Sequence, residues 1–254
     1  MNIIQSVIYG IVEGLTEFLP ISSTGHLIIV SKILGDSSEF IKNFEIVIQL
    51  GAILAVVVIY GKRLLTDFDL FKKIITAFIP TAILGLIFYK IIKQYLLGNI
   101  WVVALAMLIG GVIIILFEKG YKNKARPIFG DKITYKQAGL IGLAQSLAMI
   151  PGVSRSAATI IGGLALGLNR KQIVEFSFWL AVPTMAAASG LDLFKNYQSL
   201  AGDQMTYLVI GFVAAFVTAF ATIKVFLKFI QKNDFIVFGV YRIIVSLILL
   251  GWIL

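Results

Sequence analysis

The sequence predicts an all-α integral membrane protein with an inverted-topology repeat, and its composition is the first reason. Of the 254 residues, 59% are hydrophobic and only 14% are charged, whereas a soluble domain carries about 25% charged residues. The mean hydropathy is +0.96. Too few polar side chains are available to give the chain a water-facing surface, so lipid must cover much of it.

Long apolar runs are the second reason. A helix crosses a bilayer with roughly 20 consecutive apolar residues, and several runs here approach that length. They do not alternate apolar and polar positions as the strands of membrane barrels do, so helices are favoured. We therefore expect six spanning helices at 44–61, 74–92, 101–117, 172–190, 207–229 and 235–254.

An internal repeat is the third reason. Shifting the chain by 132 positions aligns GIVEGL at 10–15 with GLAQSL at 142–147, so that Glu13 meets Gln145. Each half opens with two short apolar stretches around a polar, proline-containing break, and then continues with three long runs. The short stretches are 3–18 and 23–34 in the first half, and 135–150 and 154–168 in the second.

Paired broken helices at corresponding positions of two halves are typical of re-entrant hairpins that meet near the membrane midplane. Three spans per half is an odd number, so the second half is expected to be inverted relative to the first. The predicted organisation is one membrane domain, 1–254, with repeats 1–117 and 135–254 joined by a basic loop at 118–134.

The distribution of lysine and arginine predicts the orientation. Most of them fall on the side that holds the 118–134 loop, and the positive-inside bias makes that side cytoplasmic. Both termini and the mouth of the first hairpin then face outward. The formal charge of +9 is thus a topology signal, and we expect no nucleic-acid partner.

Two absences narrow the chemistry. The N-terminal segment MNIIQSVIYG has no basic region or cleavage site of a secretory signal, so we expect it to be retained. The chain has no cysteine, which excludes disulfides, thiolate nucleophiles and cysteine-ligated metals.

The break in the first half, EGLTEFLPISSTGHL at 13–27, gathers polar residues in an apolar setting. Glu13 and Glu17 are four residues apart, so on a helix their carboxylates share one face. Two like charges in a poorly hydrated site require a divalent cation, an arginine or another positive partner, or else one carboxylate takes up a proton.

Hydroxyl residues follow the proline of this break. Ser22, Ser23 and Thr24 predict the N-terminus of a second half-helix, whose N–H groups and positive dipole end favour an anion. His26 lies three residues beyond Ser23 on the same helical face, where it can act as nucleophile or as general acid/base.

The break in the second half is PGVSRSAAT at 151–159. Gly152 is expected to let the backbone approach a ligand, Ser154 and Ser156 to cap the next helix, and Thr159 to follow one turn on. Arg155 at a helix N-terminus opposes the dipole, so a bound anion explains it better than stability does. Guanidinium geometry suits phosphate.

Other intramembrane polar residues carry weaker signals. Gln145 is the repeat counterpart of Glu13 and is expected to line the same pocket. Four residues near the ends of spans are expected to be solvated by the membrane interface: Glu45, Gln49, Glu175 and Arg242.

The two quoted breaks resemble the two signature motifs of the BacA-type undecaprenyl-pyrophosphate phosphatases, and the length and hydropathy fit over the whole chain. The resemblance implies a multi-pass enzyme of the bacterial inner membrane whose active site opens to the outer, periplasmic face. It implies hydrolysis of undecaprenyl pyrophosphate to undecaprenyl phosphate, which recycles the lipid carrier of peptidoglycan synthesis, and bacitracin resistance when the protein is overproduced.

Carried over by position, the resemblance puts an acidic pair at Glu13 and Glu17 and a hydroxyl and histidine at Ser23 and His26. A phosphate-binding set falls on Ser154, Arg155 and Thr159. Together with the reading of the residues, the expected catalytic set is Glu13, Glu17, Ser23, His26 and Arg155. The expected phosphate-binding set is Ser22, Thr24, Gly152, Ser154, Arg155, Ser156 and Thr159.

A divalent cation, Mg²⁺ or Ca²⁺, is expected on Glu13 and Glu17. The sequence leaves the nucleophile open between Ser23, His26 and water. It also leaves open the oligomeric state, with a homodimer as one option, and the isoprenoid chain length.

Two other classes of membrane protein fit the sequence less well. Lipid phosphatases of the acid-phosphatase superfamily resemble one another in a Ser-Gly-His and a second histidine, but this chain reads Ser-Thr-Gly-His and has one histidine. A lipid-phosphate transporter or flippase is the alternative that an inverted repeat invites. Against it, Glu13 and His26 face Gln145 and Ala158 in the repeat, so the chemistry is concentrated on one hairpin.

Overall fold

The computed structural model describes residues 1–35, 39–96, 98–122, 133–196 and 204–253. Within these ranges the chain forms helices and no strand. The first half holds α1 (Ile3–Thr16), α2 (Ser23–Leu34), α3 (Glu39–Thr66), α4 (Phe68–Ile91) with a π-helical extension (Ile92–Leu96), and α5 (Ile100–Lys122). The second half holds α6 (Tyr135–Ser146) with a 3₁₀ turn (Leu147–Met149), α7 (Arg155–Ala165), α8 (Arg170–Asn196), α9 (Met205–Phe229) and α10 (Ile236–Ile253).

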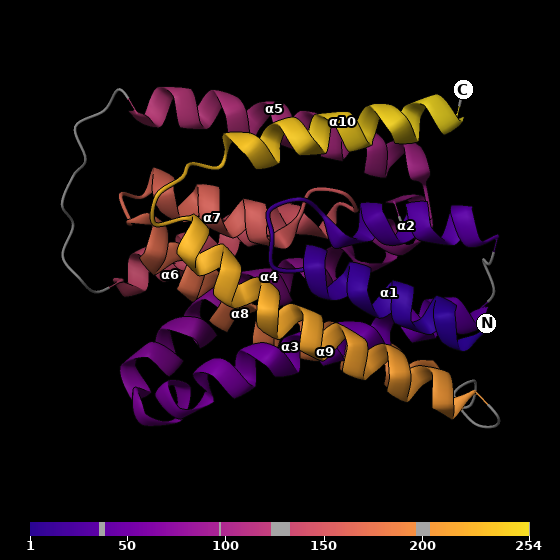
Figure 1. Ribbon diagram of the computed structural model, residues 1–254. Coiled ribbons are helices and arrows are strands. Elements are labelled where there is room, and N and C mark those ends of the chain that lie inside the picture. Colours follow the sequence, from indigo (N-terminus) through magenta and orange to yellow (C-terminus); the bar gives the residue numbers. More distant parts are fainter. Residues whose placement is uncertain (36–38, 97, 123–132, 197–203, 254) are drawn as a thin grey trace.

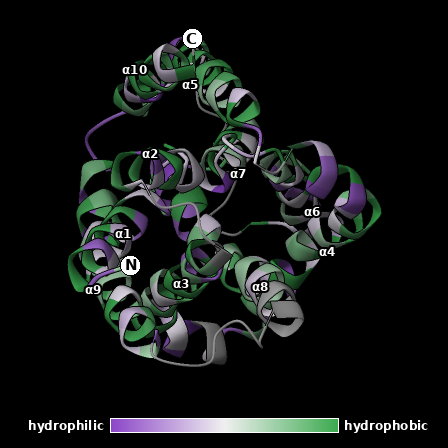
Figure 2. Cartoon of the chain, turned by 90° about the vertical axis from the view of Figure 1, so that its right-hand side faces the viewer, coloured by the Kyte–Doolittle hydropathy of each residue, from purple (hydrophilic) through white to green (hydrophobic). Residues whose placement is uncertain are grey.

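Six helices in the described ranges are long and apolar enough to cross a membrane, and they confirm the six predicted spans. Their spanning segments are Asn43–Arg63, Phe68–Leu96, Ile100–Tyr121, Arg170–Gly190, Met205–Phe229 and Ile236–Ile253. Apolar residues predominate along them (Figure 2), and large ones such as Leu86, 73% exposed, point outward. A surface of this kind suits lipid and not water, so the chain is a multi-pass membrane protein.

The four short helices pack as two consecutive pairs, α1 with α2 and α6 with α7, which we call hairpins. They have 14, 12, 12 and 11 residues, so at 1.5 Å per residue each is roughly 17–21 Å long. A hydrocarbon core of about 30 Å is too thick for any of them to cross. α1 and α2 lie toward the end of the molecule that holds both termini, whereas α6 lies toward the opposite end (Figure 1).

Helices of the first half pack against helices of the second half. α1 packs on α9 and α6 packs on α4, while α5 pairs with α10 and α3 with α8; the end-on view shows the α5–α10 pair at one edge of the bundle (Figure 2). Small residues permit the close approach of α1 to α9. A Cβ on Gly10 would lie 2.5 Å from the carbonyl oxygen of Gly211, and one on Gly14 would lie 2.6 Å from that of Ala215.

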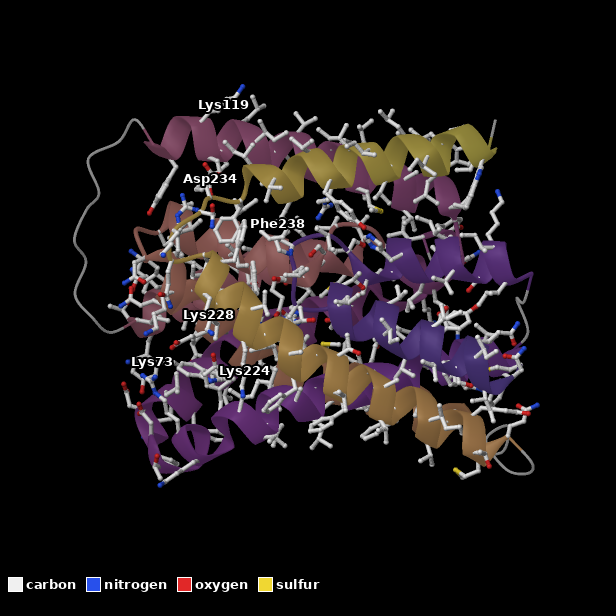
Figure 3. All side chains as sticks on the ribbon, viewed as in Figure 1. Lys73, Lys119, Lys224, Lys228, Asp234 and Phe238 are labelled. Carbon is white, nitrogen blue, oxygen red and sulfur yellow. The ribbon has the colours of Figure 1, made fainter. Side chains whose placement is uncertain are left out.

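Basic residues gather at one end of the bundle. Lys73, Lys119, Lys224 and Lys228 all lie toward the end opposite the start of α1 (Figure 3). At this end Glu118, 1% exposed, receives both Nη groups of Arg170 and the backbone N–H of Phe235. This cluster joins α5, α8 and the start of α10.

One predicted boundary was wrong. The loop expected at 118–134 begins later, because α5 continues to Lys122, and residues 123–132 lie outside the described residues. The apolar run ends at Phe117, but the helix does not. Glu118, the first residue of this extension, pairs with Arg170 of α8.

Replacement of Gly142 by alanine tests the α4–α6 contact. A Cβ at Gly142 would lie 2.0 Å from the backbone oxygen of Ala77, so α6 must move away from α4, and we expect a loss of about 1–3 kcal/mol of stability. The midpoint of thermal unfolding in detergent measures it. Gly139→Ala is the control in the same helix, because its nearest neighbour is Thr76 Cγ2 at 4.0 Å; equal midpoints for the two variants would contradict the account.

Candidate active site

The tips of the two hairpins touch each other. We call residues 17–23 the first tip and residues 150–155 the second tip. The Ser156 hydroxyl, just inside α7, donates to the carbonyl of Phe18 at 2.8 Å, and Arg155 Nη2 donates to Glu17 Oε1 at 3.1 Å. Segments almost 140 residues apart, from the two predicted repeats, therefore form one polar site.

Each tip turns through a serine with an unusual backbone. Ser22 has φ +71° and Ser154 has φ +72°, and no other non-glycine residue in the described ranges has a positive φ. Residues other than glycine are strained in this conformation, and such strain is found preferentially at functional sites. The two serines occupy equivalent positions in the repeat, immediately before α2 and α7.

The predicted caps are confirmed at one tip and corrected at the other. Ser154 accepts a hydrogen bond from the backbone N–H of Ala157 at 3.2 Å, as an N-cap does. Ser22 forms no such bond with the described residues of α2. Its carbonyl is engaged instead, by Nδ1 of His26 at 2.7 Å.

Glu17 is the centre of the site. Its Oε2 accepts a hydrogen bond of 2.6 Å from the Ser23 hydroxyl, while its Oε1 forms the ion pair with Arg155. The side chains of this ion pair are only 7% and 11% exposed. A hydroxyl bonded to a carboxylate is the arrangement of a nucleophile with its base.

Arg155 is held from several sides. Its Nη1 donates to the carbonyl of Ser177 at 2.7 Å, and its guanidinium lies over the ring of Phe18, 5.7 Å from the centroid. The Nε atom is buried and has no hydrogen-bond partner among the described residues. One donor of the guanidinium is therefore left for a ligand.

Glu13 lies one turn before Glu17 on α1 and is fully buried. Neither of its carboxylate oxygens has a hydrogen-bond partner in the part of the chain that the structure describes. Burying an ionised carboxylate without a partner costs free energy. It must hold a proton or receive a cation, so Glu13 and Glu17 are the residues that could bind a metal.

No group of three or more histidine, cysteine or acidic residues suited to a metal occurs among the described residues. Two carboxylates nevertheless fit Mg²⁺, which protein sites often bind through one or two carboxylates together with water and substrate phosphates. The orphaned oxygens of Glu13 are consistent with such a site.

A cavity of about 590 Å³ adjoins the tips. Its polar end is lined by Glu17, Ser22, Ser23, Thr24, Gly152, Ser154 and Arg155. A second polar group is formed by Gln49, Thr81, Gln145 and Thr184. Gln145 donates to the hydroxyls of Thr81 at 2.9 Å and Thr184 at 3.1 Å, which agrees with its predicted place in the pocket wall.

The rest of the cavity wall is apolar. It is formed mainly by α4 and α8, through residues that include Phe78, Ala82, Leu86, Met185 and Ala188. Leu86 and Ala188 are also exposed at the surface. The cavity thus has a charged end at the tips and an apolar flank toward the bilayer.

Four predicted site residues are absent from the described lining of this cavity: Glu13, His26, Ser156 and Thr159. Besides its bond to Ser22, His26 contacts Tyr241 Oη at 2.8 Å through its other ring nitrogen. Ser156 and Thr159 are fully buried, and the Thr159 hydroxyl is 2.7 Å from that of Ser177.

Gly152 lines the cavity, and the structure gives a further reason for glycine at this position. It has φ +94°, and a Cβ there would lie 2.4 Å from the carbonyl oxygen of Val103 in α5. Its missing side chain accommodates a neighbouring helix.

Sequence reasoning missed three residues that support the site: Ser177, Tyr241 and Arg242. Ser177 and Tyr241 carried no signal, because a single hydroxyl in a long apolar span is common. Arg242 was expected at the interface but is fully buried. A charge well inside a span is a functional signal by default, and it could have been recognised.

The chain was compared with known proteins. The family model "Bacitracin resistance protein BacA" matches residues 6–248. The undecaprenyl-diphosphatase of Persephonella marina is 52% identical over 256 residues, with 100% of both chains covered. Those of Aquifex aeolicus and Wolinella succinogenes are 50% and 49% identical, with 96% or more of each chain covered. With its two motif-bearing tips joined in one site, the chain belongs to the BacA family of bacitracin resistance proteins.

Proposed function

We propose that this protein is a membrane phosphatase that hydrolyses undecaprenyl diphosphate to undecaprenyl phosphate and inorganic phosphate. The observation that carries the proposal is the Ser23 hydroxyl donating to Glu17, which in turn pairs with Arg155. The relatives named undecaprenyl-diphosphatase over the full length of the chain support it. The reaction recycles the lipid carrier of cell-wall synthesis.

The shape of the cavity suits this substrate. The diphosphate would bind at the polar end, where Ser22, Thr24 and Ser154 line the wall beside Arg155. The N-termini of α2 and α7 would add backbone N–H groups and the positive ends of their dipoles. The isoprenoid chain would follow the apolar wall between α4 and α8 toward the bilayer.

In the proposed reaction, Ser23 Oγ attacks the terminal phosphorus while Glu17 accepts the hydroxyl proton. The bond between that phosphorus and the bridging oxygen breaks, and undecaprenyl phosphate leaves. Arg155 stabilises the charge that develops on the phosphoryl oxygens. Glu17 passes its proton to the departing phosphate oxygen and then deprotonates a water molecule that attacks the phosphoserine. The bond from phosphorus to Ser23 Oγ breaks, Oγ takes the proton back from Glu17, and inorganic phosphate is released.

His26 is assigned a positioning role in this scheme. Its bond to the carbonyl of Ser22 supports the strained turn immediately before Ser23, and both of its ring nitrogens have partners. Thr159 acts in a similar way at the second tip, because it contacts Ser177, which holds Arg155.

Glu13 and Glu17 are proposed to hold a divalent cation, Mg²⁺ or Ca²⁺. When bound, the cation would neutralise part of the diphosphate charge and polarise the phosphoryl oxygens. The buried, unpartnered carboxylate of Glu13 supports this assignment within the described residues.

We also propose that the hairpins are re-entrant and that the halves are inverted repeats. The exchanged packing of α1 on α9 and of α6 on α4 supports this, as do the positions of the hairpins toward opposite ends of the bundle (Figure 1). The basic end would face the cytoplasm. The site would then open toward the periplasmic side of the bacterial inner membrane.

Replacement of Ser23 by alanine tests the nucleophile. Without the hydroxyl, we expect phosphate release from undecaprenyl diphosphate to fall at least about a thousandfold, while binding of the lipid is retained. Ser31→Ala is the control, because Ser31 lies in the same helix and bonds to Tyr9, away from the cavity. Near-wild-type release by Ser23→Ala would favour His26 or water; a wild type that binds the lipid and releases no phosphate would favour a flippase.

Chelation tests the metal. We expect EDTA to stop phosphate release and added Mg²⁺ to restore it, and we expect Glu13→Gln to raise the Mg²⁺ concentration needed for half-maximal activity by about tenfold or more. Asp69→Asn is the control, since Asp69 pairs with Lys73 at the basic end of the bundle, away from the cavity lining. Release that resists EDTA but is lost in Glu17→Ala and Arg155→Ala would keep the phosphatase and discard the metal.

A further inference from the structure

Arg242 of α10 is fully buried. Its guanidinium makes five hydrogen bonds with the described chain, all to backbone carbonyls. The acceptors are Val153 at 2.9 Å and Pro20 at 3.4 Å for Nη1, Gly152 at 2.9 Å and Ala106 at 3.1 Å for Nη2, and Met107 at 3.3 Å for Nε.

These acceptors belong to three separate segments. Pro20 is in the first tip, Gly152 and Val153 are in the second tip, and the other two residues are in α5. Both tips leave helical geometry, so their carbonyls cannot be satisfied by a regular helix, and lipid offers no replacement. Carbonyl dipoles in turn compensate the charge of the arginine, which would otherwise be costly to bury.

The space for this guanidinium comes from Gly110 in α5. A Cβ on Gly110 would lie 2.3 Å from Arg242 Nη2. Arg242 lies 132 positions after Gly110, the same offset that relates the predicted repeats. The two residues are therefore counterparts at the contact of α5 with α10, where one side chain can reach both tips.

We propose that Arg242 is a positioning residue that fixes the two hairpin tips relative to each other. Pro20 is three residues before Ser23, and Val153 is two residues before Arg155. Arg242 thus holds the backbone next to the proposed nucleophile and next to the proposed phosphate-binding residue. This inference rests on the proposed phosphatase function.

A positioning role has a distinct kinetic signature. Ser23 and Arg155 stand on different tips, so a shift between the tips changes the alignment of attack more than it changes binding of the diphosphate in the ground state. A misplacement of about 1 Å can cost about a hundredfold in rate. The expected effect is a lower kcat with little change in KM.

Two variants test the inference. Lysine at position 242 keeps the positive charge, but one ammonium group cannot reach five carbonyls. Gly110→Ala keeps the arginine and displaces its guanidinium. This variant tests the inference if Arg242→Lys does not fold. For folded protein in detergent micelles, we expect each variant to lower kcat at least tenfold with KM within about threefold of the wild type.

The controls separate positioning from general stability. Arg170→Lys weakens the buried pair with Glu118 at the basic end, so it should lower the unfolding midpoint and leave kcat unchanged. Gly120→Ala lies in the same helix as Gly110 with no atom within 4 Å, so it should alter neither quantity.

Three outcomes are informative. Loss of kcat in Arg242→Lys or Gly110→Ala, with both controls unaffected in kcat, supports the inference. A wild-type kcat in the folded variants, or a raised KM with unchanged kcat, overturns it while the phosphatase stands. If the wild type itself releases no phosphate from undecaprenyl diphosphate, the proposed function fails first and the inference fails with it.

Discussion

Backbone carbonyls that are buried away from water must be satisfied by the protein itself, and the two hairpin tips concentrate this requirement in one place. Ser156 bonds the carbonyl of Phe18, His26 bonds that of Ser22, and Arg242 bonds carbonyls of both tips. These polar side chains therefore stabilise the backbone of the tips. Ser23, Glu17 and Arg155 line the cavity and are the groups that we propose to react.

A buried ion pair also joins the two tips. The Glu17–Arg155 pair is almost excluded from water, and removal of one partner from such a pair typically costs about 3–5 kcal/mol because the other charge is left uncompensated. The pair therefore ties the tips together before substrate arrives. A diphosphate can then replace Glu17 as the partner of the Arg155 guanidinium, whose Nε lacks a partner among the described residues.

Hydropathy was sufficient to predict the six spanning helices, because lipid imposes length and apolarity on every span. Helical spacing was sufficient to place Glu13 and Glu17 on one face of α1. Local sequence could not show which serine of the second tip faces the cavity: Ser154 does, whereas Ser156 is directed to the first tip. Nor could it assign His26, whose second partner, Tyr241, lies 215 positions away.

The most direct test of the account is a rapid-quench experiment with undecaprenyl diphosphate labelled in its terminal phosphate. If Ser23 attacks while the second tip holds the phosphate, a single turnover should transfer the label to the protein as acid-stable phosphoserine at Ser23. The label should be absent in Ser23→Ala. An acid-labile label on His26, or complete hydrolysis without labelled protein at any time point, would contradict the serine mechanism.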